Sequence, residues 1–249
     1  MNNIKYCSMK KLLLITVTIF LFVTNVKAQS TNNPYFNYKG KLIIIGGGTI
    51  PDSLFEFFAA HCGGKDQLVV YIPTATSDEK YIQEGGHLVK FTSRGFTNLS
   101  TIHTRDKAKA DAPENIALMR KAKGVFFGGG DQDLIAAAYG NTQLYKEMLA
   151  LLDRGGVIMG TSAGATIMGA LLVGGDARKD LTKKFPFQPA FSFIQNVDID
   201  QHVLVRNRQF DLIPVIETYP NHLGVGIDES TAIIVEGHQF KVWGNSYVM

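Results

Sequence analysis

The amino-acid sequence predicts an α/β protein built on a doubly wound, mostly parallel sheet. Three observations support this prediction. Short apolar segments alternate with longer amphipathic ones along most of the chain, which is the pattern of successive βαβ units. Most of the short segments are apolar throughout, as expected for strands that are buried on both faces. Two Gly-Gly-Gly segments directly follow such strands, where the chain must turn tightly toward a helix.

Each element follows from this pattern in turn. The first five expected strands are Leu42–Ile45, Leu68–Ile72, Leu99–His103, Val125–Phe127 and Val157–Met159. The helices expected between them are Asp52–His61, Asp78–Phe91, Pro113–Lys121 and Gln143–Leu152. Asp52 and Asp78 are the expected N-caps, because an aspartate oxygen can accept the free amides of a first helical turn. Gly63 and Gly155 are suited to end a helix.

The pattern changes after Leu172. Residues Val203–Glu217 are expected to be helical, with an interruption at Pro214. Shorter strands are expected at Gly226–Asp228, Thr231–Glu236 and Gln239–Trp243. Because no linker-like segment is present, residues 40–249 are predicted to form a single domain after a polar lead-in at residues 29–39.

The N-terminus has the features of a signal peptide. Lys10 and Lys11 precede an apolar segment, Leu12–Val23, which is too short to span a bilayer comfortably. Val26-Lys27-Ala28 then places small residues at the positions that a signal peptidase reads. We expect residues 1–28 to be removed and the protein to be exported to the periplasm or the medium, without a membrane anchor. An uncleaved anchor is the alternative.

The charge distribution changes with that segment. The whole chain has 25 basic and 22 acidic residues, a formal net charge of +3. Residues 1–28 hold four lysines and no acid, so the remainder has 25 − 4 = 21 basic against 22 acidic residues, a net of −1. The domain therefore has no basic surplus that would favour a nucleic-acid partner.

The sequence predicts neither a metal nor a cofactor. Cys62 is the only cysteine after the leader, which excludes an intramolecular disulfide and a thiolate metal site. No His-Glu-x-x-His motif or phosphate-binding loop occurs. The Gly46-Gly47-Gly48 segment departs from the dinucleotide fingerprint, because Pro51 stands where its third glycine belongs. We interpret Gly46–Gly48 as a simple strand-to-helix turn.

The sequence Gly160-Thr161-Ser162-Ala163-Gly164 follows an expected strand and matches a nucleophile elbow. The flanking glycines would permit a strained turn that lifts the Ser162 hydroxyl above the sheet. The Ala163 amide, at a helix N-terminus, would then be free to stabilise an oxyanion. The alternative is a motif that serves packing alone, which the preceding strand makes the weaker interpretation.

The second glycine-rich turn, Gly128–Gly130, also follows a strand end. The Gly130 amide is a candidate for the other half of an oxyanion hole, and Gln132 is a candidate contact for a substrate amide. A simple turn with Asp131 as the N-cap of a helix is an equally good interpretation at this stage.

A serine nucleophile needs a general base. His202 is the candidate, because it ends the short strand Val-Asp-Ile-Asp-Gln-His and is expected to begin a helix. The polar residues around it are Asp200, Gln201, Arg206 and Arg208. A charged helix start capped by Asp200 is the alternative. The other histidines are isolated and receive no role: His61, His87, His103, His222 and His238.

The base in turn needs an orienting carboxylate. Asp228 and Glu229 both follow the apolar segment Gly224–Ile227, and spacing alone does not choose between them. Either choice gives the order serine, histidine, acid, whereas an α/β-hydrolase has the acid before the histidine.

Taken together, four segments resemble the cyanophycinase branch of the serine peptidases that also contain aspartyl dipeptidase. They are Phe-Phe-Gly-Gly-Gly-Asp-Gln, Gly-Thr-Ser-Ala-Gly-Ala, Asp-Gln-His with a downstream Arg-x-Arg, and Gly-Ile-Asp-Glu-Ser-Thr-Ala. The likeness extends from about Gly40 to the C-terminus. The resemblance implies a class I glutamine-amidotransferase-like fold and a triad of Ser162, His202 and Glu229.

The resemblance also implies a substrate. The family hydrolyses cyanophycin, a poly-aspartate backbone with arginine on each side-chain carboxyl, to β-aspartyl-arginine dipeptides. The positions that match the family's substrate pocket are Gln132, Asp200, Gln201, Arg206 and Arg208. Arg206 and Arg208 are expected to clamp carboxylates of the aspartyl chain.

Two departures leave alternatives open. Asp211 stands where a third arginine is usual, and the chain ends at Met249 where relatives continue through about one more strand, so the domain is either trimmed or truncated there. The alternatives are a related peptidase of short aspartyl or isoaspartyl peptides and a catalytically inactive binding protein of the same fold. A homodimer is compatible with each of them.

Overall fold

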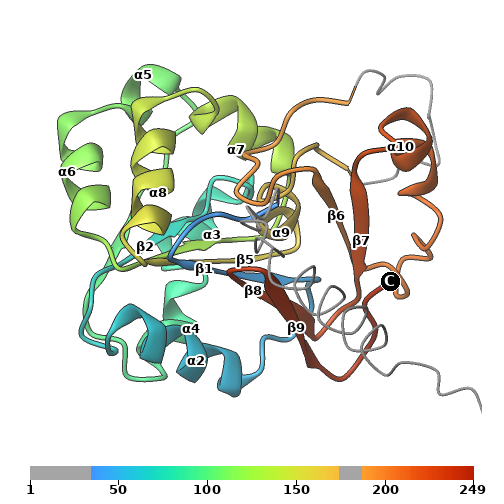
Figure 1. The fold of residues 1–249 in the computed structure, drawn as a ribbon. Helices are drawn as coiled ribbons and strands as arrows, with labels where there is room; N and C mark the ends of the chain where they lie inside the picture. The colour runs from blue at the N-terminus through green and yellow to red at the C-terminus, as the bar shows by residue number, and fades with distance from the viewer. Residues whose placement is uncertain (1–34, 174–186) are drawn as a thin grey trace, which may run out of the picture. The chain divides into compact units, whose positions relative to one another are not determined.

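A computed structural model describes residues 35–173 and 187–249 (Figure 1). The expected signal peptide, residues 1–28, and the first part of the expected lead-in lie outside the described residues. Among the described helices, none combines the length and the apolar character that a bilayer span requires.

The centre of the domain is a seven-stranded sheet with the strand order β3-β2-β4-β5-β1-β8-β9. Its strands are β1 (Lys41–Ile45), β2 (Val69–Ile72), β3 (Leu99–Thr101), β4 (Gly124–Phe127), β5 (Val157–Thr161), β8 (Thr231–Glu236) and β9 (Gln239–Gly244). Strands β1 to β5 are parallel, β8 pairs antiparallel with β1, and β9 pairs antiparallel with β8. The predicted doubly wound, mostly parallel sheet is confirmed.

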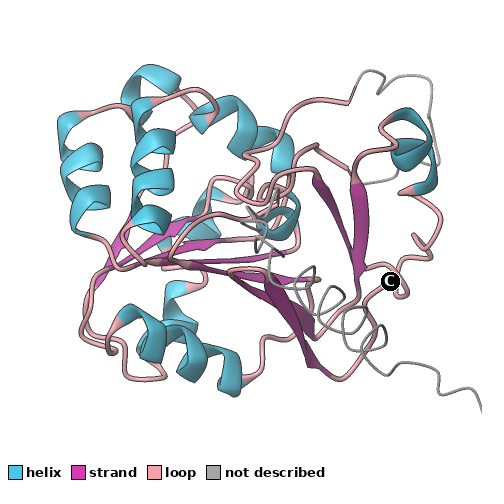
Figure 2. Ribbon diagram, viewed as in Figure 1, coloured by secondary structure: helices cyan, strands magenta, loops and turns pink. Residues whose placement is uncertain are grey.

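Helices cover both faces of this sheet (Figures 1 and 2). On one face lie α2 (Asp52–Cys62) and α4 (Leu88–Thr92); on the other lie α5 (Lys107–Ala110), α6 (Pro113–Lys121), α7 (Gln132–Tyr139), α8 (Gln143–Asp153) and α9 (Ala163–Thr166). Successive strand residues enter different cores: Ile43 packs with the first group and Ile44 with the second. The continuous apolar runs are therefore explained by burial on both faces.

A second, two-stranded sheet carries the residues that follow Leu172. Its parallel strands are β6 (Val197–Gln201) and β7 (Leu223–Ile227), and α10 (Ile213–Thr218) packs beside β7. Ile216 of α10 lies against Gly224 at the start of β7. This small sheet brings the end of β6 to the end of β1, where the His202 amide donates to the Gly46 carbonyl.

The expected single helix Asp78–Phe91 is wrong. The chain forms two short helices, α3 (Glu79–Gln83) and α4, separated by Gly85 and Gly86, which have φ angles of 91° and 50°. Such left-handed angles end a helix and suit glycine. Asp78 is an N-cap, because its carboxylate accepts the Tyr81 amide. Asp52 is not: Pro51 occupies the cap position of α2 and Asp52 is the first helical residue.

The expected helix Val203–Glu217 is also wrong over most of its length. Turns occupy the residues from His202 to Leu212, and only α10 is helical. The Asp228 carboxylate, from a distant segment of the chain, accepts the amides of Leu204 and Val205 and so holds these turns in place. Asp200 does not cap a helix, because it is inside β6.

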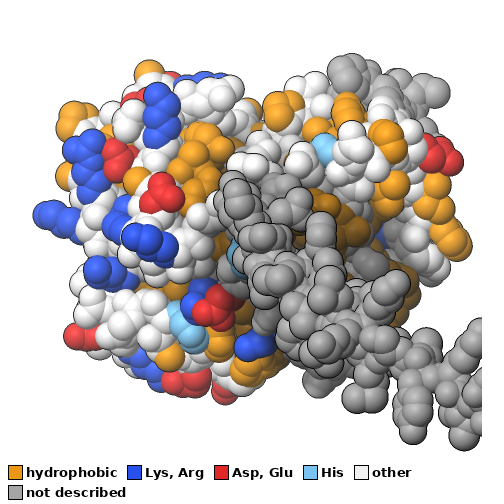
Figure 3. Space-filling view, viewed as in Figure 1, with side chains coloured by type: hydrophobic (Ala, Val, Ile, Leu, Met, Phe, Trp, Pro, Cys, Tyr) orange, Lys and Arg blue, Asp and Glu red, His pale blue; other side chains and the backbone are white. Residues whose placement is uncertain are grey.

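On the face seen in Figure 3, the described residues form no continuous basic region. Lysine and arginine side chains over α5, α6 and α8 are interspersed with acidic ones, and apolar side chains gather over the part of the molecule that contains α10. Among the described residues of that part, Val205, Phe210 and Ile213 are large apolar side chains that are exposed.

Candidate active site

Ser162 stands at the carboxyl end of β5, in a backbone conformation that few residues adopt. Its φ and ψ are 56° and −117°, and α9 begins with the next residue. Such a conformation costs about 1–3 kcal/mol and persists only where the surrounding structure enforces it. Here the Ser162 amide donates to the Ile45 carbonyl of β1, and its carbonyl accepts the amides of Ala165 and Thr166. The sharp turn predicted from the sequence is therefore present.

The two glycines that flank this turn are required by close packing. A Cβ atom on Gly160 would lie 2.1 Å from the Gly164 carbonyl oxygen. A Cβ atom on Gly164 would lie 2.4 Å from the carbonyl oxygen of Phe127, at the end of β4. Any side chain at either position would push α9 away from the sheet and move Ser162 with it.

His202 follows β6 and connects the serine to a carboxylate. Its Nε2 lies 2.9 Å from Ser162 Oγ, and its Nδ1 lies 2.5 Å from Glu229 Oε1. An ionised carboxylate only accepts, so Nδ1–H donates to Glu229 and leaves Nε2 as the acceptor for the serine hydroxyl. The structure thus joins the three predicted residues in one hydrogen-bonded chain. His202 has a φ of 56° and begins no helix, which corrects that expectation.

Asp228 and Glu229, which spacing alone did not separate and between which the family resemblance favours Glu229, have different positions. Glu229 faces His202, with its side chain 30% exposed. Asp228 is buried and accepts the Ser246 hydroxyl as well as the two backbone amides after Val203. Burial would raise the pKa of Asp228, but the donors at Ser246, Val205 and Leu204 outweigh it and hold the pKa below its usual value. Asp228 therefore anchors the segment that follows His202.

The turn at Gly46–Gly48 contributes to this arrangement, which the sequence interpretation missed. Gly47 has a φ of 114°, and a Cβ atom there would lie 2.1 Å from His202 Cε1. A Cβ atom on Gly48 would lie 2.9 Å from both Cβ and Oε2 of Glu229. The Gly46 carbonyl accepts the His202 amide. These glycines form a surface against which the imidazole and the carboxylate pack. The sequence interpretation, a simple strand-to-helix turn, did not include this role.

The imidazole is set up to be neutral at physiological pH. Burial lowers the pKa of His202, the hydrogen bond to Glu229 opposes this, and the positive charges of Arg206 and Arg208 lower the pKa further. The net direction is downward. A neutral imidazole with its proton on Nδ1 is the form that can accept the proton of Ser162.

Of the expected oxyanion donors, Ala163 directly follows Ser162, and Gly130 belongs to the loop whose Gly129 lies against the serine. Among the described residues, the amides of Ala163 and Gly130 have no hydrogen-bond acceptor. Gly129 approaches Ser162 most closely in this loop, because a Cβ atom there would lie 3.3 Å from Ser162 Cβ. Asp131 also caps α7 by accepting the Asp133 amide. The loop therefore fits both interpretations that the sequence left open: it caps a helix and covers the serine.

Asp200 and Gln201 lie inside the molecule beside His202. Asp200 is fully buried; its Oδ1 accepts the Gln201 amide, and its Oδ2 has no partner among the described residues. The Gln201 side-chain oxygen is buried and equally unpartnered there. Burial raises the pKa of Asp200 to about 6, Gln201 and Arg208 counteract it, and the nearby Asp211 raises it further. Two buried acceptors without donors indicate a site suited to a ligand that donates hydrogen bonds.

The two arginines differ in exposure. Arg208 is buried: its Nη1 donates to the Gln201 carbonyl and lies 3.9 Å from Asp200 Oδ1. Arg206 is exposed, and its amide donates to the His202 carbonyl in a single turn rather than in the expected helix. Arg206 is therefore the more accessible of the two expected carboxylate contacts.

Gln132, the expected contact for a substrate amide, is buried at the start of α7.

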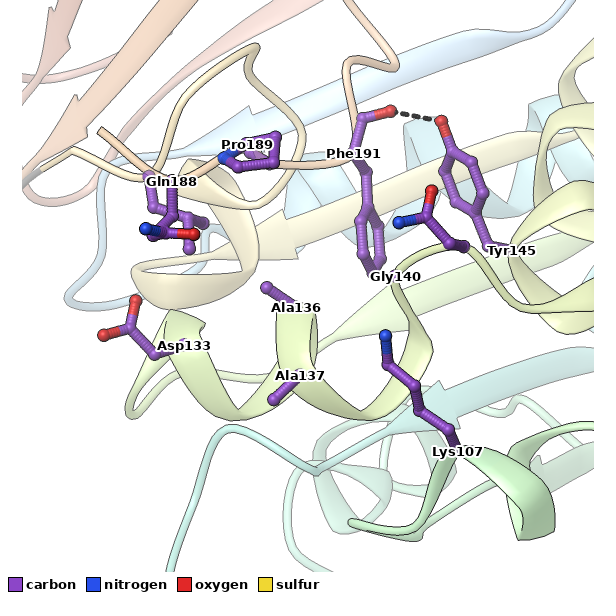
Figure 4. Close-up of a pocket in the computed structure, with 12 residues that line it drawn as sticks. Lys107, Asp133, Ala136, Ala137, Gly140, Tyr145, Gln188, Pro189 and Phe191 are labelled. Carbon is purple, nitrogen blue, oxygen red and sulfur yellow. Dashed lines mark hydrogen bonds between the residues drawn. The ribbon is translucent and has the colours of Figure 1, made fainter. Parts of the chain in front are cut away.

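A cavity of about 440 Å³ lies beside α7, apart from these residues (Figure 4). Lys107 of α5 and Asp133 of α7 contribute charged groups to its wall, and Tyr145 and Phe191 contribute aromatic surface. The Tyr145 hydroxyl donates to the Phe191 carbonyl. Ser162, His202 and Glu229 do not line this cavity. It therefore does not provide the immediate surroundings of Ser162.

Comparison with known families decides the relationship of the chain. The model of peptidase family S51 matches residues 42–243. The chain belongs to peptidase family S51. This S51 chain is 29% identical to a cyanophycinase of Synechococcus elongatus over 214 residues, which is 84% of the chain and 66% of that protein. It is 28% identical to a cyanophycinase of Geminocystis herdmanii over 184 residues, 72% of the chain and 67% of that protein. The S51 chain thus spans about two thirds of the length of these curated relatives.

Solved structures share the fold of the S51 chain. A peptidase from an acI-B1 Actinobacterium aligns with a TM-score of 0.68 at 22% identity, covering 86% of this chain and 90% of that one. A putative peptidase E protein from Listeria monocytogenes EGD-e aligns with a TM-score of 0.59 at 18% identity, covering 83% and 99%. The predicted class I glutamine-amidotransferase-like fold and the predicted family relationship are both confirmed.

Proposed function

We propose that this chain is a serine peptidase that hydrolyses cyanophycin to β-aspartyl-arginine dipeptides. The observation that carries the proposal is the hydrogen-bonded chain from Ser162 through His202 to Glu229, on a strained turn at a strand end. The family relationship and the cyanophycinase relatives support the substrate, although the alignment spans only part of those proteins.

The geometry supports an acyl-enzyme mechanism. Ser162 attacks the peptide carbonyl while His202 Nε2 accepts its proton, and Glu229 holds the imidazole in the productive tautomer. The amides of Ala163 and Gly130 stabilise the oxyanion, and each such donor is worth about 3–4 kcal/mol of barrier. His202 then protonates the leaving amine, and water releases the acyl group by the reverse sequence.

The buried acceptors beside His202 support a substrate that carries guanidinium groups. A guanidinium has several N–H donors in a planar fork, which suits the unpartnered oxygens of Asp200 and Gln201. Its positive charge would also favour the ionised form of Asp200, whose pKa of about 6 reflects burial without a full set of partners. Exposed Arg206 can contact a carboxylate of the aspartyl backbone.

The decisive experiment is mass spectrometry of the products released from cyanophycin granules by the wild type and by Ser162→Ala. The wild type should release soluble β-aspartyl-arginine, and the alanine variant should release less by at least ~10³-fold, because it lacks the nucleophile. Gln143→Ala, an exposed change on α8, serves as the matched control. Equal release of the dipeptide by Ser162→Ala and wild type would overturn the assignment of Ser162 as the nucleophile. No release by either protein would favour an inactive binding protein.

A second candidate is a peptidase of short aspartyl or isoaspartyl peptides. It is favoured by Asp211, which stands where the family usually has a third arginine and adds negative potential at Asp200. Added negative charge there weakens the hold on an aspartate-rich backbone. Aspartyl dipeptides and isoaspartyl dipeptides assayed beside the polymer separate the two candidates, because this second peptidase would cleave the dipeptides and leave the granules intact.

We also propose that the protein works outside the cytoplasm. The lysines before a short apolar segment and the small residues that end at Ala28 support this. N-terminal sequencing of protein recovered from the periplasm or the medium should begin at Gln29. A mature protein that begins at Met1 and stays in the cytoplasm would refute export.

A further inference from the structure

A partly buried polar cluster lies next to the glycine loop and has no part in the chain from Ser162 to Glu229. Tyr71 of β2 is 1% exposed, and its hydroxyl lies 3.2 Å from His87 Nδ1. The Tyr81 hydroxyl lies 2.9 Å from the same nitrogen, and the His87 amide donates to the Tyr71 hydroxyl. The rings of Tyr71 and His87 both pack against Phe126 of β4. The position of the Tyr71 hydroxyl is therefore fixed from several sides.

The Tyr71 hydroxyl also meets the loop that covers the nucleophile. A Cβ atom on Gly128 would lie 3.2 Å from this hydroxyl and 3.6 Å from His87 Nδ1, so the Gly128 backbone rests on the cluster. The next residue, Gly129, lies over Ser162. A continuous set of contacts thus runs from His87 through Tyr71 to the loop and on to the serine.

One end of the loop is fixed to the end of β2 and the other to the segment that follows β2. The Gly128 amide donates to the Ile72 carbonyl, and the Asp131 amide donates to the Ala75 carbonyl. Gly130, with a φ of 135°, packs so closely on Ala75 that a Cβ atom would lie 2.2 Å from its carbonyl oxygen. Tyr71 is the side chain nearest to the first loop glycine, Gly128, and His87 lies just beyond it. The height of the loop over Ser162 thus depends on β2 and on Tyr71.

We propose that Tyr71, held in place by His87, is a positioning residue that sets the distance between the Gly128–Gly130 loop and Ser162 during catalysis. This inference rests on the proposed serine-peptidase function. An oxyanion hole is effective only when its donors lie within a few tenths of an ångström of the developing charge. Removal of the Tyr71 hydroxyl leaves the His87 amide without its acceptor and leaves a gap beside Gly128. The distance between the loop and Ser162 would then no longer be fixed.

The cluster is suited to this task because it stays uncharged. Burial lowers the pKa of His87 to about 4, and the positive charge of Lys90 contributes in the same direction. Burial also raises the pKa values of Tyr71 and Tyr81. The three groups that meet at His87 Nδ1 thus remain neutral across the physiological range, and the support does not change with pH there.

The test compares Tyr71→Phe with Tyr139→Phe. Tyr139 is also fully buried near the carboxyl end of the sheet, with its hydroxyl 2.6 Å from Thr74 Oγ1, but it does not touch the glycine loop. Both variants lose one buried hydroxyl, so both should lose similar stability. The first readout is the rate at which a fluorophosphonate labels Ser162. The second is kcat and KM for the release of dipeptide from cyanophycin.

Tyr71→Phe should label at least ~10-fold more slowly and lose kcat with little change in KM, because a misplaced oxyanion donor acts on the transition state. Tyr139→Phe should stay within about twofold of the wild type. Equal labelling rates in the two variants would overturn the inference while leaving the proposed function intact. A wild type that fluorophosphonate does not label would remove the proposed function, and the inference with it.

A second pair of variants tests the cluster if Tyr71→Phe does not fold. His87→Asn keeps an amide oxygen near the place of Nδ1, whereas His87→Leu removes the acceptor. We expect His87→Asn to retain most of the labelling rate and His87→Leu to lose it to the same extent as Tyr71→Phe. If both variants lose the rate equally, or if neither does, Tyr71 is not positioned through His87.

Discussion

Two Gly-Gly-Gly turns flank the nucleophile, and they support different halves of the site. Strands β4 and β1 lie on either side of β5, so Gly128–Gly130 and Gly46–Gly48 meet Ser162 from opposite sides. Gly129 of the first turn lies against Ser162, where the proposed mechanism places the oxyanion, and Gly46–Gly48 packs against His202 and Glu229. The same short sequence thus serves two purposes, because the side chain that each turn contacts is supplied by a different part of the chain.

Each turn rests against a histidine, and the two histidines have different surroundings. Burial lowers the pKa of both. His202 has Glu229 at 2.5 Å, which opposes the effect of burial and keeps the ring able to take a proton. His87 has two tyrosine hydroxyls and the charge of Lys90, and its pKa falls to about 4. A carboxylate partner therefore distinguishes His202, the proposed general base, from His87, the proposed neutral support.

Among the changes at the two turns and their neighbours, the largest expected effect comes from Gly47→Ala. The new methyl group would lie 2.1 Å from His202 Cε1, and the φ of 114° is strained for alanine. Displacing the imidazole by about 1 Å should lower kcat/KM by at least ~10²-fold. The measurement is kcat/KM together with the unfolding free energy from chemical denaturation.

Gly237→Ala is the control for that change. Gly237 also has a positive φ, of 55°. Apart from its chain neighbours, no atom of the described residues lies within 4 Å of its Cβ position, so it reports backbone strain without a clash. If Gly47→Ala kept wild-type kcat/KM, the turn could not be the support of His202.

The next effect concerns His87 and stability in acid. Its folded-state pKa of about 4 lies below the unfolded value of about 6.5, so protons favour the unfolded chain. The stability that His87 contributes is present above pH 6.5 and is lost as the pH falls toward 4. His87→Asn should remove this part of the pH dependence, on the order of 1–3 kcal/mol between those pH values.

Urea unfolding of the wild type and of His87→Asn across that range is the measurement. Data at pH 8, where the ring is neutral in both states, give the cost of the substitution itself. Parallel curves for the two proteins would show that His87 does not titrate in this way. The groups that face its ring and must be considered are Tyr71, Tyr81 and Lys90.

A smaller effect is expected for Gly129→Ala, at the middle of the other turn. Its Cβ would lie 3.3 Å from Ser162 Cβ, and Gly129 does not have the left-handed backbone of Gly47. A shift of a few tenths of an ångström should lower kcat/KM by about 3–10-fold. Burst kinetics would show whether acylation is the step affected. A loss as large as that of Gly47→Ala would remove the distinction between the turns.

The smallest effect is a change in the pH profile. The charge of Arg206 contributes to the lowered pKa of His202, so Arg206→Gln should move the acid limb of the kcat/KM profile to higher pH. Arg206→Lys keeps the charge and should leave the limb in place. Because Arg206 is exposed, added salt should reduce the difference between the variants. An unmoved limb in Arg206→Gln at low salt would contradict this electrostatic account.

Local patterns predicted much of this protein. The apolar runs of the five parallel strands, the boundaries of Pro113–Lys121 and the cap at Asp78 agree with the structure, since they depend on burial and capping within a few residues. Two expectations about helices failed at places where a tertiary contact outweighs local preference. Gly85 and Gly86 deliver His87 to Tyr71, and Asp228 accepts the amides after Val203.

The sequence by itself determined that a strand enters a glycine-flanked serine and that a histidine and two acids stand downstream of it. Spacing left two acids open and the family resemblance favoured Glu229, but only the tertiary structure shows which one faces the imidazole. Asp228 and Glu229 are neighbours whose side chains diverge, one toward Ser246 and one toward His202. The tertiary structure also decided that Gly46–Gly48 and Tyr71 belong to the site. Those contacts join segments far apart in the chain, and their formation depends on how the strands are ordered in the sheet, which no local pattern specifies.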